Sequence, residues 1–70
     1  MEFQLREGEE FIPINTLMKL LRWVESGGQA HAFIAEGMVQ LNGEVVHEKR
    51  KKVRAGDTVS FHGQEANICA

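Results

Sequence analysis

The chain of 70 residues is 43% hydrophobic and 26% charged, a composition that fits one folded domain over residues 1–70 rather than a disordered or fibrous chain. No apolar run approaches the roughly 18 residues that cross a bilayer, and the amino terminus has no secretory signal, so we expect a cytoplasmic protein. A single cysteine can form neither an internal disulfide nor a zinc cluster, so we expect no metal or other cofactor. The formal net charge of −2 says little about partners, because local fields depend on where the charges lie.

The first half of the chain predicts one strand and two helices. Residues 2–6 alternate polar and apolar side chains, as a half-buried strand does. Apolar side chains then recur at helical spacing from Ile14 to Val24, with Asn15 as the predicted N-cap. Residues 26–29 (Ser-Gly-Gly-Gln) have the form of a capping box, in which the serine accepts from the glutamine N–H and the glutamine side chain returns to the serine N–H. A second helix follows and ends near Gly37, so the short gap predicts an αα-hairpin.

The second half of the chain changes to period two and predicts an antiparallel sheet. Asn42-Gly43 is typical of a type I′ turn and lies between two apolar strands. A further turn at Gly56-Asp57 precedes alternating apolar residues at Val59 and Phe61. The last residues, 66–68, allow one more strand.

The predicted order is therefore β-α-α-β-β-β, with one further strand allowed. This order indicates an α+β fold, in which a two-helix hairpin packs on a small antiparallel β-sheet. We expect Trp23 and Phe33 to supply much of the core, because large aromatic side chains bury the most apolar surface.

Residues 49–54 hold the densest charge of the chain. They contain five of its eight basic residues, Lys49, Arg50, Lys51, Lys52 and Arg54, and Val53 is expected to turn inward and anchor them. The middle of the chain, residues 11–54, carries seven basic and four acidic side chains, for a net charge of +3. Residues 1–10, with four glutamates and one arginine, have a net charge of −3, and residues 55–70, with two acidic side chains, have a net charge of −2. Clustered cations repel one another unless an anion offsets them, which favours a phosphate-binding surface. A solvated turn is the alternative.

Other candidate contacts lie in the two predicted helices. Lys19 and Arg22 are three residues apart and share one side of the first helix; an ordinary exposed helix face is the alternative. Ser26-Gly27-Gly28 would present free amides at a helix N-terminus, unless the glycines serve only to form the turn. Gln29 and His31, early in the second helix, could donate to phosphate, sugar or base, and an ordinary structural role is the alternative for His31.

Several motifs, in order and at matching spacing, resemble the RNA-binding domain named after ribosomal small-subunit protein S4. They are Ile14-Asn15 with Leu17 and Lys19, Ser26-x-x-Gln29-Ala30-x-x-Phe33-Ile34-x-x-Gly37, Val39-x-Leu41-Asn42-Gly43-x-x-Val46 and Val53-Arg54-Ala55-Gly56-Asp57-x-Val59. The resemblance covers roughly residues 11–61 and is strongest to the small stand-alone bacterial YbcJ-like proteins. Pro13 and His31 depart from it, because many members of the family have basic residues at these places.

The resemblance implies the αL motif, in which two helices and a β-loop present one RNA-binding face. This face would include Lys19, Ser26, Gln29 and residues 49–54, and the relatives bind ribosomal, transfer or other folded RNA. The base edges of A-form RNA lie in a deep, narrow groove, so a compact basic face is expected to recognise the shape of structured RNA through phosphates and 2′-hydroxyls. No aromatic residue is interleaved with the basic run in the sequence, which makes base stacking a lesser expectation. We expect a monomer with no membrane partner and no small-molecule substrate.

An enzyme, a duplex DNA-binding protein and a protein–protein interaction module are the alternative functions. An enzyme would need a nucleophile with a base, a carboxylate pair or a metal cluster, and His31, His47 and His62 are scattered over different predicted elements. Binding to duplex DNA would need an element with a row of residues that read bases in the major groove, and neither predicted helix carries such a row. A small protein–protein interaction module is the main alternative, since the acidic amino-terminal segment and residues 49–54 could form two halves of a docking surface.

Overall fold

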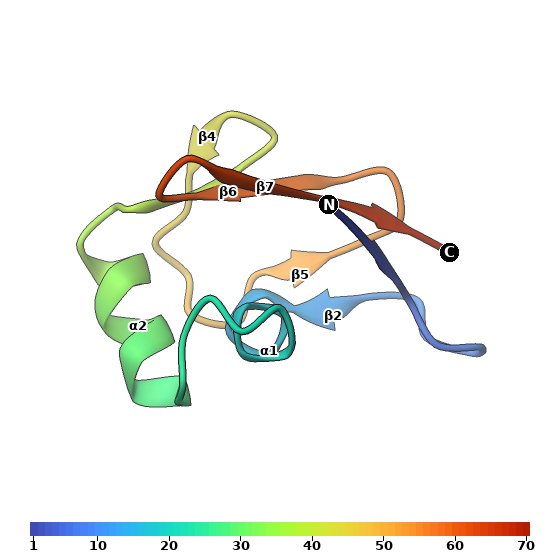
Figure 1. The fold of residues 1–70 in the computed structure, drawn as a ribbon, viewed down its shortest axis with the longest axis horizontal. Helices are drawn as coiled ribbons and strands as arrows, with labels where there is room; N and C mark the ends of the chain where they lie inside the picture. Colours follow the sequence, from blue (N-terminus) through green and yellow to red (C-terminus); the bar gives the residue numbers. More distant parts are fainter.

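The structure is a computed structural model that describes residues 1–70. In chain order its elements are β1 (Glu2–Gln4), β2 (Ile12–Pro13), α1 (Ile14–Leu20), α2 (Gly27–Ala35), β3 (Val39–Leu41), β4 (Glu44–Val45), β5 (Lys52–Val53), β6 (Thr58–Phe61) and β7 (Gln64–Cys69). A five-stranded sheet forms one layer, and the two helices lie beneath it together with the pair β2–β5 (Figure 1). The predicted α+β architecture is confirmed. Neither helix has the length and apolar character that crossing a membrane requires.

The five-stranded sheet has the order β1-β7-β6-β3-β4. Its neighbours are antiparallel except for β1, which runs parallel to β7 with Phe3 beside Ile68. The sheet is therefore mixed, whereas the sequence predicted an antiparallel one. The two strands come from opposite ends of the chain, so no tight turn sets their relative direction. The last strand is confirmed and is longer than residues 66–68.

Two tight turns join consecutive strands. Asn42-Gly43 connects β3 to β4 with φ values of 53° and 85°, as a type I′ turn requires and as the sequence predicted. His62-Gly63 connects β6 to β7 with φ values of 51° and 77°. Both turns place two residues in the left-handed region, which matches the right-handed twist of the flanking strands.

Helix α1 differs from the prediction at both ends. Pro13 is its N-cap and provides no side-chain hydrogen bond, so the predicted cap by Asn15 is wrong. The amide of Ile14 instead donates to the carbonyl oxygen of Lys51 at 2.8 Å, so the start of the helix is satisfied by a distant segment. The helix ends at Leu20, well before Val24. Arg22 follows at φ 61° and ends the helix in a left-handed turn.

Helix α2 begins as its motif predicted. The amide of Gln29 donates to Ser26 Oγ at 3.2 Å, which is one half of the capping box. The side-chain oxygen of Gln29 accepts from the amide of Glu25 at 2.7 Å, and not from Ser26 as predicted. The helix ends at Ala35, and Gly37 follows with a φ of 76°, close to the predicted end.

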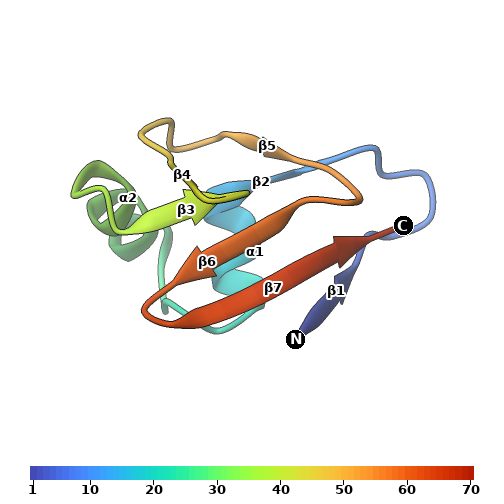
Figure 2. The same ribbon diagram turned by 90° about the horizontal axis from the view of Figure 1, so that it is seen from above.

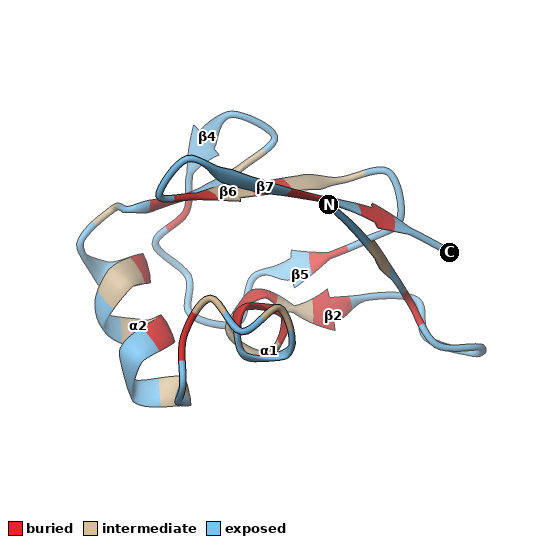
Figure 3. Ribbon diagram, viewed as in Figure 1, coloured by how far each residue is buried: buried red, intermediate tan, exposed pale blue.

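The core lies between the sheet and the helix layer. Its buried residues, red in Figure 3, occupy the faces that these layers turn toward each other, and none of them is polar. Trp23 and Phe33 are only partly buried, which corrects the expectation that they supply much of the core. Their ring centroids lie 6.0 Å and 5.0 Å from that of Phe61, so they pack at the margin of a mainly aliphatic interior.

The sequence did not predict the short pair β2–β5. Ile12 pairs with Val53 and Pro13 with Lys52 in an antiparallel register. Each strand has two residues, too few to show a period of two in the sequence. This pair brings the basic residues 49–54 to the beginning of α1.

Candidate nucleic-acid interface

Residues 49–54, which we call the basic segment, are held at the start of α1. The connection from β4 to β5 descends from the sheet layer beside α2 and reaches α1 (Figures 1 and 2). Two buried valines, Val46 and Val53, lie on either side of the turn, and the carbonyl oxygen of Lys51 accepts from Ile14. Lys49 and Arg50 are exposed between these anchors. The backbone of the segment is therefore fixed while its cationic side chains reach solvent.

The side chains of β5 alternate as the strand geometry requires. Val53 is fully buried, as predicted, and its partner Ile12 also faces the core. Lys52 and Arg54 are exposed and point away from the core, because alternate residues of a strand lie on opposite faces. The outer face of this short ribbon is consequently cationic.

Phe11 belongs to this outer face, and sequence reasoning missed it. Its ring centroid lies 4.9 Å from Lys52 Nζ and 5.9 Å from Arg54 Cζ, within the range of cation–π contacts. No aromatic residue is interleaved with the basic run along the chain, but in space Phe11 lies beside Lys52 and Arg54. No local signal could have shown this contact, because it depends on the pairing of β2 with β5.

A second group of candidates surrounds the junction between the helices. Lys19, in the last turn of α1, and Arg22, just after it, are both exposed. Ser26 caps α2 through its Oγ, and the side-chain oxygen of Gln29 is also engaged. The side-chain amide nitrogen of Gln29 makes no hydrogen bond within the protein and is the donor that a ligand could use. A Cβ added at Gly27 would meet no atom within 4 Å, so the backbone there is open to approach, while one at Gly28 would lie 3.8 Å from Ser26 Oγ.

The two groups of candidates meet α1 at opposite ends. The basic segment bonds to Ile14, the first residue of the helix, whereas Lys19 is five residues further along. At a rise of about 1.5 Å per residue, these positions are separated by about 7.5 Å along the helix axis. Figure 2 shows α1 running from β2 toward the connection with α2. The predicted residues therefore form two groups linked by one short helix.

His31 lies between the two helices rather than on the open surface. It is partly buried, and its Nε2 lies 3.1 Å from Nδ2 of Asn15 in the first turn of α1. This contact ties α2 to α1 and occupies one ring nitrogen. A contact from His31 to a ligand stays a prediction and would have to use the other nitrogen.

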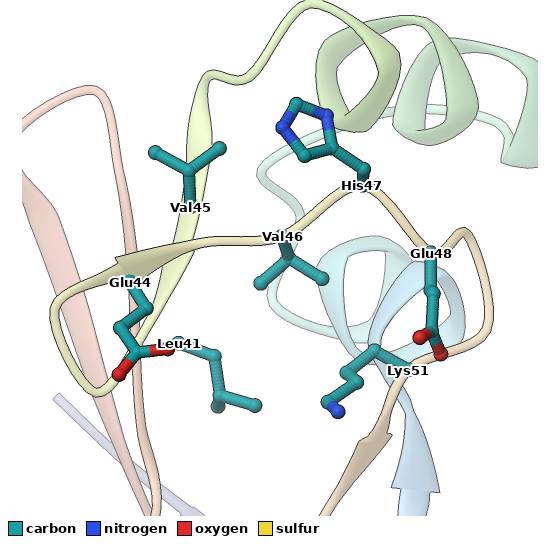
Figure 4. Close-up of a pocket in the computed structure, with 7 residues that line it drawn as sticks. All are labelled: Leu41, Glu44, Val45, Val46, His47, Glu48 and Lys51. Atoms are coloured by element: carbon teal, nitrogen blue, oxygen red, sulfur yellow. The ribbon is translucent and has the colours of Figure 1, made fainter.

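A small pocket of about 160 Å³ adjoins the basic segment (Figure 4). Its lining residues are Leu41, Glu44, Val45, Val46, His47, Glu48 and Lys51. Val46 and Leu41 form the apolar part of the lining, and the ammonium group of Lys51 and the carboxylates of Glu44 and Glu48 form its charged part. These carboxylates repel phosphate from the pocket itself, and a contact of Lys51 with a polyanion outside the pocket stays a prediction.

No three or more His, Cys, Asp or Glu side chains are grouped so that they could hold a metal ion. Cys69 is an exposed free thiol on the last strand, and its Sγ lies 3.5 Å from the carbonyl oxygen of Phe3.

The fold and the site define a class of small α+β proteins in which a helix pair and a β-loop share one side of a sheet. Residues 3–69 match the family model described as S4 domain. The chain therefore belongs to the S4 domain family, as its motifs indicated.

Two relatives are similar over most of their length. They are "Putative RNA-binding protein YbcJ" of Escherichia coli (strain K12) and "Uncharacterized protein YbcJ" of Shigella flexneri. Each is 50% identical over 54 residues, which are 77% of this chain and 77% of the relative.

A solved structure extends the likeness to nearly the whole fold. The solution structure of YbcJ from E. coli covers 99% of this chain and 86% of its own, with 42% identity and a TM-score of 0.75. It is described as revealing an αL motif involved in RNA-binding. The predicted resemblance to YbcJ-like proteins and the αL motif are thus confirmed.

Proposed function

We propose that this protein binds structured RNA, without catalysis, through phosphate contacts made by the basic segment and the helix pair. The observation that carries the proposal is the hydrogen bond from the amide of Ile14 to the carbonyl oxygen of Lys51, at 2.8 Å. It joins the most cationic part of the chain to the helix pair that characterises the motif. The likeness to YbcJ, whose name and structure refer to RNA binding, supports the same ligand.

The physical basis is the exposure of fixed cations. Lys49 and Arg50 project from the turn, and Lys52 and Arg54 project from the outer face of β5. A backbone held by two buried valines lets these side chains meet phosphates with little further ordering of the main chain. Because the bases of A-form RNA are inaccessible from its narrow groove, such a surface recognises the course of the sugar–phosphate backbone.

The helix junction supplies further contacts in this proposal. Lys19 and Arg22 add charge, the amides of Gly27 and Gly28 lie in the first turn of α2, where helix geometry gives them no intrahelical acceptor, and Gln29 offers its side-chain amide. Because the residues at the helix junction are separated from the basic segment along α1, the two groups can hold different phosphates of one folded RNA. Ribosomal, transfer and other folded RNAs all present such backbones.

We propose that residues 1–70 act as one RNA-binding domain, with the core motif at about 11–61, as a monomer in the cytoplasm and without a small-molecule substrate. RNA incubated with the protein should be recovered intact, since binding and not cleavage is the proposed activity.

A pair of charge reversals tests the proposal. Arg50→Glu and Arg6→Glu each change the formal net charge from −2 to −4. Arg6 lies outside the basic segment, just before the turn that leads to Phe11, and its amide donates to Glu9 Oε1 at 2.8 Å. With a folded RNA hairpin and bulk transfer RNA as ligands, Arg50→Glu is expected to weaken binding about tenfold or more, because a charged contact is replaced by repulsion. Arg6→Glu should weaken binding much less than Arg50→Glu, because a surface charge that does not contact a phosphate acts only through solvent and is screened by salt.

The outcomes separate the possible errors. Equal weakening by both reversals would mean that only the total charge matters. Unchanged binding by Arg50→Glu would remove the basic segment from the site. Absence of binding to either RNA by the unaltered protein would end the proposal.

A further inference from the structure

Phe11 is an exposed aromatic residue that does not belong to the hydrophobic core. Its neighbour Ile12 pairs with Val53, and both face the interior with 3% and 0% exposure. Continuing this antiparallel register by one residue places Phe11 beside Arg54, on the outer face of the ribbon. Phe11 is 36% exposed as a residue, and it is the one aromatic residue among the exposed large hydrophobic residues of the protein.

Two cations of the basic segment flank this ring. Lys52 Nζ and Arg54 Cζ lie 4.9 Å and 5.9 Å from its centroid. Both cations are on long, flexible side chains that can leave the ring for a phosphate while their backbone stays paired. An accessible aromatic face next to mobile cations is the combination by which proteins hold unpaired nucleotides, with the base on the ring and the backbone on the charges.

We propose that Phe11 stacks an unpaired nucleobase of the bound RNA, while Lys52 and Arg54 hold the phosphates adjoining that nucleotide. This inference rests on the proposed function and deepens it, because it names the kind of RNA that the site prefers. The bases of a continuous duplex are stacked on both sides and offer no free face. The preferred ligand is therefore a folded RNA with a bulge, loop or junction next to the contacted phosphates.

The surroundings of Phe11 set the direction of approach. Glu9 and Glu10 precede it in the chain and are exposed, so they repel the RNA backbone on that side. Lys52 and Arg54 attract it on the side of β5. The backbone is thus expected to follow β5 and the basic turn, with the unpaired base directed inward onto Phe11.

Two RNA hairpins that differ by one nucleotide test the inference. They share the same stem and are closed by a polyethylene glycol linker in place of a nucleotide loop, so that neither has unpaired loop bases, and one contains a single unpaired 2-aminopurine as a bulge. Phe11→Leu keeps an apolar side chain but removes the aromatic face, and is expected to raise the Kd for the bulged hairpin about 5- to 150-fold. The Kd for the fully paired hairpin should change less than about twofold, because this ligand has no base to place on Phe11.

Matched variants and a second signal complete the experiment. Phe11→Trp should retain the preference for the bulged hairpin, since indole also offers a stacking face. Phe3→Leu removes a ring from β1, on the sheet edge, and should alter neither affinity. The emission of 2-aminopurine should change when the unaltered protein binds and should change much less with Phe11→Leu.

Each result leads to a definite conclusion. Equal weakening for both hairpins would show that Phe11 only positions the cations, and no weakening for either would show that it is not in the site; both overturn the stacking inference. If the unaltered protein binds both hairpins equally and Arg50→Glu weakens both, the proposed function stands and stacking fails. If it binds neither hairpin, the proposed function itself fails.

Discussion

Neutralising Lys49 and Arg50 is expected to reduce the salt dependence of RNA binding by a calculable amount. Both residues are exposed in the turn before β5, where the amide of Lys51 donates to the carbonyl oxygen of Glu48 at 3.3 Å. Lys49→Gln with Arg50→Gln removes two charges without altering a buried side chain. The free energy of unfolding should therefore stay nearly the same, which isolates the electrostatic effect.

The magnitude follows from counterion release. If each of the five cations of the basic segment neutralises one phosphate, the slope of log affinity against log salt concentration is about −3.5, and with three cations it is about −2.1. Between about 50 and 200 mM salt, the affinity should fall about 130-fold for the unaltered protein but about 20-fold for the double variant. The two lines should converge as the salt concentration rises.

Fluorescence anisotropy with a labelled RNA hairpin over a series of KCl concentrations measures both slopes. Arg6→Gln is the control, because it removes a charge outside the basic segment and should leave the slope unchanged. Parallel lines for the unaltered protein and the double variant would refute the assignment of Lys49 and Arg50 to the phosphate contacts. A slope near zero for the unaltered protein would refute the electrostatic account as a whole.

Two further predictions concern the stability of the fold, measured by urea denaturation. Gly43→Ala should lower the free energy of unfolding by about 1 kcal/mol, because Gly43 has a φ of 85° in the type I′ turn. Gly27→Ala is the control: Gly27 has no positive φ and nothing lies within 4 Å of the added Cβ, so the free energy of unfolding should stay unchanged or rise by up to about 1 kcal/mol. Equal effects of the two substitutions would show that backbone conformation is not the cause. Ser26→Ala should lower the same free energy by about 1 kcal/mol and Ser26→Gly by only a few tenths, because the serine Oγ caps α2; a larger loss with glycine would contradict a capping role.

Short-range features of this fold were predictable from the sequence because each depends on neighbouring residues. The turn at Asn42-Gly43 needs two residues that accept positive φ. The start of α2 needs a serine whose oxygen reaches an amide three residues later. Such signals are complete within a few positions, and the resemblance to the S4 family follows from their order along the chain.

Predictions failed where the decisive partner is distant in sequence. Asn15 looked like the N-cap of α1, yet the amide of Ile14 is satisfied by Lys51, from a different part of the chain. The direction of β1 could not be predicted, because its partner β7 comes from the other end of the chain. The periodic pattern up to Val24 suggested a longer helix, although Arg22 leaves the helical conformation before it.

The sequence by itself determined the helix pair, the β3–β4 hairpin, the family and the density of charge in residues 49–54, since these are properties of contiguous residues. Only the tertiary structure decided where that charge faces and what lies beside it. Pairing of β2 with β5 puts Phe11 against Lys52 and Arg54. The physical reason is that strand pairing is chosen by burial of Ile12 and Val53 in a shared core, and two-residue strands have no pattern that would show this choice in advance.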